Sequence, residues 1–119
     1  MTAAQAIKHI AYTTNWFMDG AFGTGFDMDF EQYLEEMKKP VTLEDAMGQL
    51  DAAFDKYIAL LESKTSEELA GPMPDNKIFG AAPRMVVITS NAEHTAHHRG
   101  ALGVYLRLLG IVPAMVYSE

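Results

Sequence analysis

Apolar residues recur along this chain at helical spacing and separate it into four segments. The first segment runs from about Ala3 to Asp19. Its apolar stripe consists of Ile7, Ile10, Ala11 and Phe17. The second segment runs from Phe30 to Lys39, is short and acidic, and ends before Pro40. The residues of this segment that we expect to face inward are Tyr33, Leu34 and Met37.

The third segment, from 43 to 61, carries the clearest pattern of the sequence. Thr42 is placed to cap it, and Asp45 follows as a partner for a capping box. Its apolar residues recur at intervals of three and four, which is typical of a helix packed at a shallow angle against other helices. They are Leu43, Met47, Leu50, Phe54, Tyr57 and Leu61.

The last segment runs from about Arg84 to Leu109 without an internal proline, and Gly110 and Pro113 mark its end. One face of this helix should carry Val87, Asn91, His94, His98, Leu102, Tyr105 and Leu109. Beyond the histidines the segment is apolar on nearly every side. We therefore expect its second half to be deeply buried.

The connections between these segments differ in length. Gly20, Gly23 and Gly25, followed by Asp27, should end the first helix and form a turn. They do not form a phosphate loop, because no strand precedes them and no Gly-Lys-Ser/Thr run follows. The connection 63–83 is long for a helical bundle, and its apolar residues could fold over an opening. These residues are Met73, Ile78 and Phe79.

No stretch of the chain has a clear strand pattern, so we predict an all-α fold that forms a single domain over residues 1–119. The chain is globular in composition, with 49% hydrophobic and 21% charged residues. Its net charge is -7, and the acidic residues are concentrated in the first two-thirds. A nucleic-acid binder needs a concentrated basic surface, and none is visible here.

Cysteine is absent, which excludes disulfides and thiolate metal sites. Imidazole and carboxylate are the strong metal ligands that remain. The start of the sequence lacks the pattern of a signal peptide, and no apolar run is long enough to span a membrane. These features predict a soluble, cytoplasmic protein.

Three of the four histidines, His94, His97 and His98, lie close together in the last predicted helix. His94 and His98 are one turn apart on the same face, so their imidazoles can converge on one point. Catalytic metal sites commonly combine three protein ligands with one open position. His9 is the one other histidine and therefore the candidate for the third ligand. It shares a line of the first helix with Gln5, Tyr12, Thr13 and Trp16.

The spacing alone is equally consistent with haem ligation, with a hydrogen-bonded histidine cluster, or with a half-exposed His9 on a surface helix. His97 points about 60° away from His94 around the helix, so we expect it beside the site and not as a fourth ligand. Asn91, Glu93 and Tyr105 are within helical reach as hydrogen-bond partners. Glu93 does not lie between two histidines, which excludes the His-Glu-x-x-His arrangement of metalloproteases.

Residues 93–113 read Glu-His-Thr-Ala-His-His-Arg-Gly-Ala-Leu-Gly-Val-Tyr-Leu-Arg-Leu-Leu-Gly-Ile-Val-Pro. This segment resembles the C-terminal signature of the DinB/YfiT-like metalloprotein family, in which His-x-x-His-His-Arg-Gly-Gln precedes a leucine-rich turn, glycine and proline. Lys8-His9-Ile10 resembles the earlier histidine-bearing helix of that family. The resemblance implies an up-down-down-up four-helix bundle. It also implies a divalent ion, zinc or nickel, held by His9, His94 and His98.

Two departures from the family pattern stand out. Ala101 occupies the position of the family's glutamine, so any role of that side chain is missing. Family members usually have a whole helix before the first histidine, whereas eight residues precede His9. The bundle should then lack its first long helix and leave an apolar groove, which we expect a second copy to fill as a two-fold homodimer. The alternative is a sequence that lacks its natural start.

Some members of that family are thiol-dependent transferases or isomerases. The resemblance therefore implies a metal-dependent enzyme of small-molecule chemistry, an S-transferase or a hydrolase, whose ion activates water or a thiol such as bacillithiol or mycothiol. Arg99 is the candidate for positioning an anionic substrate group. We expect Tyr12, Trp16, Asn91 and His97 to line the pocket or to support the metal ligands from outside. No general base can be assigned. The alternative is a noncatalytic, stress-related helical domain that binds a metal or a ligand.

Overall fold

The computed structural model describes residues 1–115, and its regular structure is helical throughout that range, which confirms the all-α prediction. The helices are α1 (Ala3–Phe22), α2 (Phe30–Lys38), α3 (Leu43–Glu62), α4 (Ser66–Ala70) and α5 (Val86–Leu108). The short α4 lies in the connection predicted to be irregular. Its signal was present in the sequence, because Thr65 and Glu68 form a capping box.

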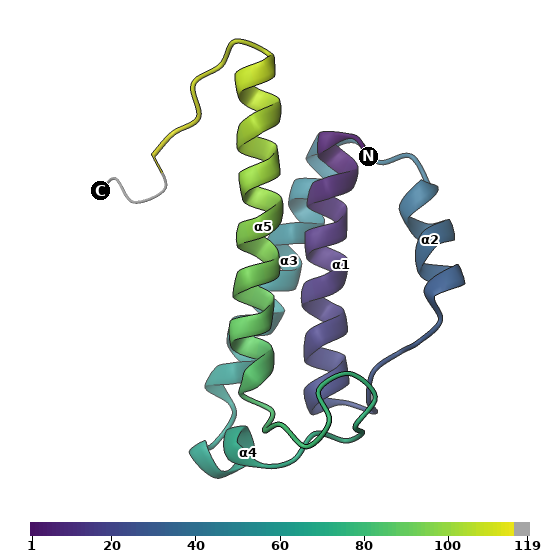
Figure 1. The fold of residues 1–119 in the computed structure, drawn as a ribbon, viewed down its shortest axis with the longest axis vertical. Coiled ribbons are helices and arrows are strands. Elements are labelled where there is room, and N and C mark those ends of the chain that lie inside the picture. The colour runs from purple at the N-terminus through teal and green to yellow at the C-terminus, as the bar shows by residue number, and fades with distance from the viewer. Residues whose placement is uncertain (116–119) are drawn as a thin grey trace.

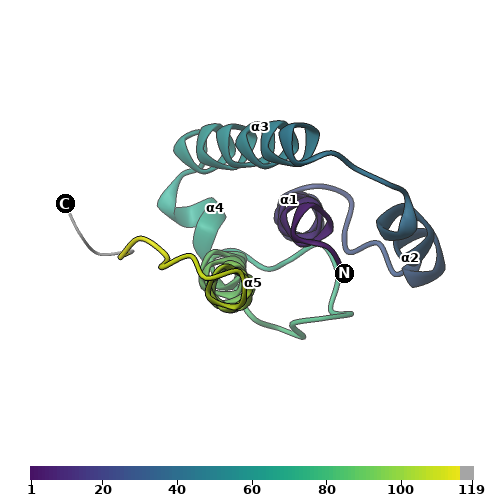
Figure 2. The same ribbon diagram turned by 90° about the horizontal axis from the view of Figure 1, so that it is seen from above.

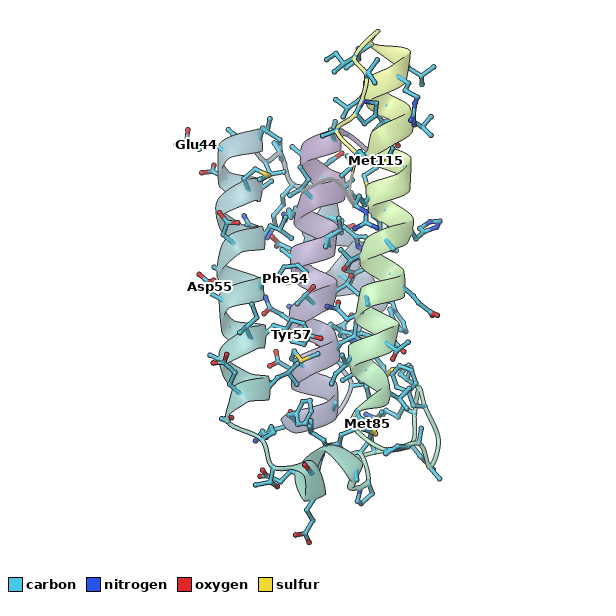
Figure 3. The ribbon with its side chains drawn as sticks, turned by 90° about the vertical axis from the view of Figure 1, so that its left-hand side faces the viewer. Glu44, Phe54, Asp55, Tyr57, Met85 and Met115 are labelled. Atoms are coloured by element: carbon cyan, nitrogen blue, oxygen red, sulfur yellow. The ribbon has the colours of Figure 1, made fainter. Side chains whose placement is uncertain are left out.

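Helix α1 lies between α3 and α5 and contacts both of them (Figures 1 and 2). Helices α1 and α3 run in the same direction, and α5 runs in the opposite direction (Figure 1). Within residues 1–115, α3 and α5 make no close backbone contact with each other. A surface of α1 is therefore visible between them (Figure 3).

Helix α1 extends one turn beyond its predicted end. Gly20 lies within α1 and does not end it. Its lack of a side chain lets the Phe26 ring pack directly on the backbone, because a Cβ there would lie 2.3 Å from two ring carbons. The chain turns only at Gly23, and Gly25 adopts a positive φ of 108° that favours glycine. The first glycine thus serves packing, and the later two serve the turn.

A hydrophobic cluster closes the end of the helices below the histidines. It consists of Phe17, Met18, Ala21, Phe26, Met73 and Val87. From the long connection, Phe79 packs against this cluster, with its ring centroid 5.6 Å from that of Phe26. Ile78 is 38% exposed and does not join it. The long connection thus completes the core at this end of the molecule.

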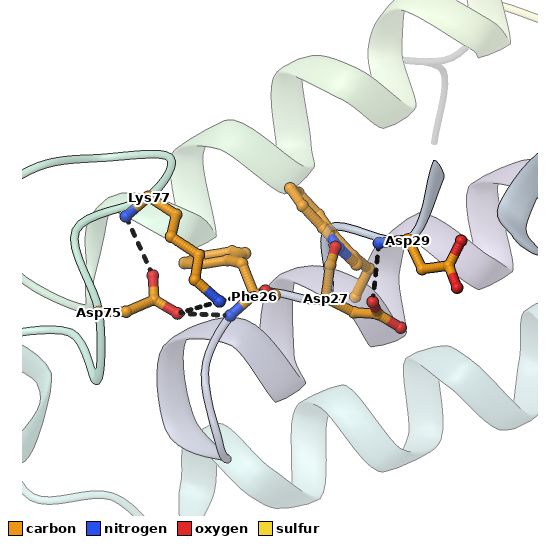
Figure 4. A network of polar contacts seen from close by, with 6 residues as sticks. Phe26, Asp27, Asp29, Asp75 and Lys77 are labelled. Atoms are coloured by element: carbon orange, nitrogen blue, oxygen red, sulfur yellow. Dashed lines mark hydrogen bonds and ion pairs between the residues drawn. The ribbon is translucent and has the colours of Figure 1, made fainter. Parts of the chain in front are cut away.

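Polar contacts fasten this connection to the loop after α1 (Figure 4). The Asp75 carboxylate accepts the backbone N–H of Phe26 at 2.9 Å and that of Lys77 at 3.1 Å. Burial alone would raise the pKa of Asp75, but these N–H groups and the Lys77 ammonium more than offset it, so the pKa lies below its usual value. The loop that carries Asp27 and Asp29 is therefore fixed from one side by Asp75.

Helix α2 is held against α1 by polar contacts more than by apolar ones. The buried Lys8 ammonium donates to the Glu36 backbone carbonyl at 2.7 Å and lies 3.0 Å from the Glu36 carboxylate. Gln5 donates to the Met37 carbonyl at 3.3 Å. Met37 is buried, but Leu34 is 53% exposed, so the prediction that Leu34 faces inward was wrong. These contacts place Tyr33 of α2 next to His9 of α1.

Two expectations about apolar faces were wrong. Helix α3 packs through Ala46 and Ala53, while Leu43 and Met47 of the predicted seam are 58% and 43% exposed. The rest of that seam, Leu50, Phe54, Tyr57 and Leu61, is half-buried. The second half of α5 is exposed as well, and Leu108 reaches 79% exposure. The reason is geometric, because this part of α5 extends past the start of α1 and finds no helix beside it (Figure 1).

Candidate metal centre and its cavity

Helices α1 and α5 bring three histidines together. The Nε2 atom of His94 lies 3.0 Å from that of His9 and 3.2 Å from that of His98. One ring nitrogen from each of the three histidines lies within 4.8 Å of the others. The one-turn spacing of His94 and His98 on α5 explains their convergence, and the packing of α1 against α5 supplies His9.

Hydrogen bonds alone satisfy this arrangement poorly. A neutral imidazole nitrogen offers either one proton or one lone pair, so Nε2 of His94 can serve only one of its two close neighbours well. In a tetrahedral zinc site with Zn–N bonds of 2.0–2.1 Å, neighbouring nitrogens lie roughly 3.3 Å apart. The observed contacts of 3.0 and 3.2 Å are close to that spacing. The two separations at His94 therefore suit a divalent ion, and the ring nitrogens of His9 and His98 lie within 4.8 Å of each other.

The surroundings keep the three rings neutral, as metal ligands must be. Burial, together with the other two histidines, lowers the pKa of His9 to about 4. Burial also lowers the pKa of His94, and the neighbouring His98 and His97 lower it further. Burial and the neighbouring His97 also lower the pKa of His98. Near neutral pH these lone pairs are thus available to a cation.

The outer nitrogen of His9 has a partner that the sequence did not reveal. Tyr33 Oη on α2 lies 2.6 Å from His9 Nδ1, and Thr13 Oγ1 lies 3.5 Å from it. When Nε2 faces a metal, Nδ1 carries the proton and donates it to Tyr33, which fixes the ring orientation. The outer nitrogen of His94, in contrast, is buried with no hydrogen-bond partner among the described residues. None of the three candidates within helical reach, Asn91, Glu93 and Tyr105, bonds to it.

Asn91 instead fixes the register between the helices. Its side chain is buried one turn before His94, and Thr14 of α1 donates to Asn91 Oδ1 at 3.1 Å. Tyr57 of α3 also interacts with Asn91. Because Thr14 and Asn91 each lie close in sequence to a histidine, their bond holds His9 and His94 at the same height. Asn91 therefore links the helices beside the histidines, and it lines the hollow between α3 and α5 and not the cavity that His9 and His94 border.

A cavity of about 170 Å³ opens beside the histidines, and His9 and His94 form part of its wall. The rest of the wall is largely aromatic and consists of Tyr12, Trp16, Phe30 and Tyr33 with Thr13. Asp27 and Asp29, from the connection between α1 and α2, line it as well. Tyr12 and Trp16 were expected here, whereas Phe30, Asp27 and Asp29 were missed, because a loop and a capping position bring them to the site.

His97 and Arg99 lie elsewhere. His97 is exposed, with its ring centroid 5.0 Å from that of His98, and it is not one of the three clustered histidines. Arg99 is exposed and lines a different hollow, between α3 and α5. It is therefore not placed to hold a substrate group in the cavity beside the histidines.

Among residues 1–115, no helix is both long and apolar enough to cross a bilayer. Comparison with curated proteins and with solved structures finds no match. The model of the DinB family, by contrast, matches the chain over residues 1–119. That match spans α1 with His9 and α5 with His94 and His98. The chain therefore belongs to the DinB family.

Proposed function

We propose that this protein is a metal-dependent enzyme of small-molecule chemistry, with His9, His94 and His98 as the ligands of a zinc or nickel ion. The observation that carries this proposal is the convergence of three neutral imidazoles at the wall of an aromatic cavity. Imidazole suits both metals. When bound, such an ion lowers the pKa of a water or thiol at its open position.

The chain itself would orient the ligands and surround the substrate. Tyr33 fixes the ring of His9, and the bond between Thr14 and Asn91 fixes the relative height of α1 and α5. The aromatic walls exclude bulk water around a bound molecule while leaving it in contact with His9 and His94. A purely structural metal site is closed, so the cavity favours substrate chemistry over a noncatalytic role.

The test combines metal analysis of the purified protein with a screen of low-molecular-weight thiols against electrophiles and of simple hydrolysable esters and amides. We expect a stoichiometric divalent ion, and turnover that a chelator abolishes and that zinc or nickel restores. An ion that binds without any turnover in this screen would favour the noncatalytic alternative. Absence of the ion would reject the metal site itself.

We also propose that a second copy of this chain covers the groove between α3 and α5. The groove has a volume of about 430 Å³ and is lined by Phe54, Tyr57, Ile88, Asn91, Ala92, Thr95, Ala96 and Arg99. Figure 3 shows Phe54 and Tyr57 on the α3 side of it. The Thr95 hydroxyl is buried there without a partner in the described residues. Leu106, which is 37% exposed, continues the groove along the same face of α5, and exposed apolar patches generally mark an interface.

Charge complementarity favours a second copy as the occupant. Helix α3 is acidic, with Glu44, Asp45, Asp51, Asp55 and Glu62 against one lysine. Helix α5 carries Arg99 and Arg107 against Glu93. A two-fold axis would place α5 of each copy against α3 of the other, so that each acidic helix meets a basic one. A helix of the second copy would then take the fourth place of the bundle beside α1, α3 and α5.

Sedimentation equilibrium tests this proposal with one matched pair of variants. The wild-type protein should sediment at about twice the chain mass of 13.1 kDa. Ala92→Glu places a charge in the groove and should yield a monomer. Ala52→Glu adds the same charge to an exposed position on another side of α3 and should leave the dimer intact. A monomeric wild-type protein would contradict the proposal.

A further inference from the structure

The charges around the cavity beside the histidines have one sign. Asp27 and Asp29 contribute carboxylates, and neither lysine nor arginine is among the lining residues. The nearby Lys8 is committed to Glu36, and Arg99 lines the groove on the other side of the site. Burial raises the pKa of Tyr12, and the negative charges of Asp27, Asp29 and Glu36 raise it further.

Both aspartates are held in place by backbone groups. Asp27 Oδ1 accepts the N–H of Asp29 at 2.9 Å (Figure 4), and Asp29 Oδ1 accepts the N–H of Gln32 at 2.9 Å as the N-cap of α2. The loop that carries them is tied down by Asp75, which binds the N–H of Phe26. The two aspartates are thus held in fixed positions at the edge of the cavity.

The aromatic rings are equally fixed. The Trp16 indole donates to the Asp27 carbonyl at 2.7 Å, which places that ring beside the acidic loop. The rings of Tyr12 and Tyr33 lie 5.1 Å apart at 52°, and Tyr33 is anchored by His9. Several aromatic faces around one space, with carboxylates close by, are the arrangement by which proteins recognise ammonium groups.

We propose that this cavity selects a small organic cation, a molecule whose ammonium group sits among Tyr12, Trp16 and Tyr33 near Asp27 and Asp29, with its other end toward the histidines. This inference rests on the proposed function, because it names the substrate class of the same site. It also narrows that function: polyanionic thiols are disfavoured, since the cavity offers no lysine or arginine to pair with negative charges beyond the one that the ion would bind.

The single tryptophan of the sequence, Trp16, reports binding directly by its fluorescence, and calorimetry gives a second readout. Three probes of nearly equal shape separate charge from size: choline, neutral neohexyl alcohol with a tert-butyl group in place of trimethylammonium, and the tert-butylacetate anion. Choline should bind at least about tenfold more tightly than the neutral alcohol, and the anion most weakly. Equal or tighter binding of the alcohol, or no binding of choline by either readout, would overturn the proposal.

A charge-neutralised variant tests the two aspartates. Asp27→Asn combined with Asp29→Asn keeps the backbone contacts, because asparagine caps helices as well as aspartate does. Its affinity for choline should fall by roughly three- to tenfold, while that for the neutral alcohol stays unchanged. Asp51→Asn removes an exposed carboxylate of α3 outside the cavity and serves as the control. Equal losses for choline and alcohol would mean that only the cavity shape had changed.

Metal content, measured on the same samples, separates the two proposals. Preference for choline in a protein that binds no divalent ion would reject the metal-dependent function and keep the cation cavity. A protein that binds a divalent ion but shows no preference for choline would reject the cation cavity and keep the metal site.

Discussion

Replacing His94 with alanine should weaken divalent metal binding by on the order of 100-fold or more. Structural zinc sites are worth about 10–16 kcal/mol over four ligands, so one imidazole accounts for roughly 3 kcal/mol. His94 is also the middle member of the cluster, since its Nε2 is close to both of the others. Its loss leaves His9 and His98 without the ring between them.

Thermal unfolding with and without zinc measures this effect. For the wild-type protein, zinc at 100 times its dissociation constant should stabilise the fold by about 2.7 kcal/mol and raise Tm by roughly 10 °C. The His94→Ala protein should show almost no rise at the same zinc concentration. His97→Ala is the matched control, because His97 is an exposed neighbour outside the cluster. An unchanged zinc response in His94→Ala would exclude this ring as a ligand.

Replacing Phe26 with alanine should lower the free energy of unfolding by about 3–5 kcal/mol. The Phe26 side chain is 2% exposed, belongs to the cluster below the histidines, and fills the space over Gly20. Typical domains are stable by only about 5–15 kcal/mol, so this loss is a large share of the total. Urea denaturation followed by circular dichroism gives the value.

Because Phe26 packs on Gly20, the effect of Gly20→Ala on the free energy of unfolding should change sign when Phe26 is absent. Gly20→Ala in the wild-type protein should destabilise by about 1–3 kcal/mol, because the clash with the ring outweighs the better helix propensity of alanine. In the Phe26→Ala background the clash is gone, and the same change should stabilise. Gly48→Ala, where no atom lies within 4 Å of the new Cβ, should stabilise α3 by about 0.5–1 kcal/mol in both backgrounds. Simple additivity of the first pair would refute the packing of Phe26 on Gly20.

The three long helices could be predicted from the periodicity of their apolar residues, because α3 and α5 each bury one face against α1. Periodicity could not tell which apolar stripe of α3 is buried. The small Ala46 and Ala53 let α3 approach α1 closely, so larger residues such as Leu43 remain exposed. The same limit applies to the second half of α5, whose apolar character predicted burial. It is instead a surface that no other helix within residues 1–115 covers.

The histidine cluster was accessible to sequence reasoning because two of its members are one helical turn apart and His9 was the one candidate left. Its surroundings were accessible only in part, through Tyr12 and Trp16 on the same line of the first helix. Tyr33 reaches His9 because the ion pair of Lys8 with Glu36 holds α2 against α1. A contact of this kind between helices cannot be read from the periodicity of either helix. Asp27 was predicted to lie in a turn and Asp29 was not singled out, and the place of both in the cavity depends on how the loop folds back.

His9 and His94 are separated by 85 positions, yet their ring nitrogens are neighbours. An ion held between them would link α1 to α5 like a clasp, and it would oppose any motion that separates these two helices. Such a clasp cannot close on a nascent chain until α5 has left the ribosome. Metal loading should therefore be one of the final events in the maturation of this protein and should follow the docking of its last helix.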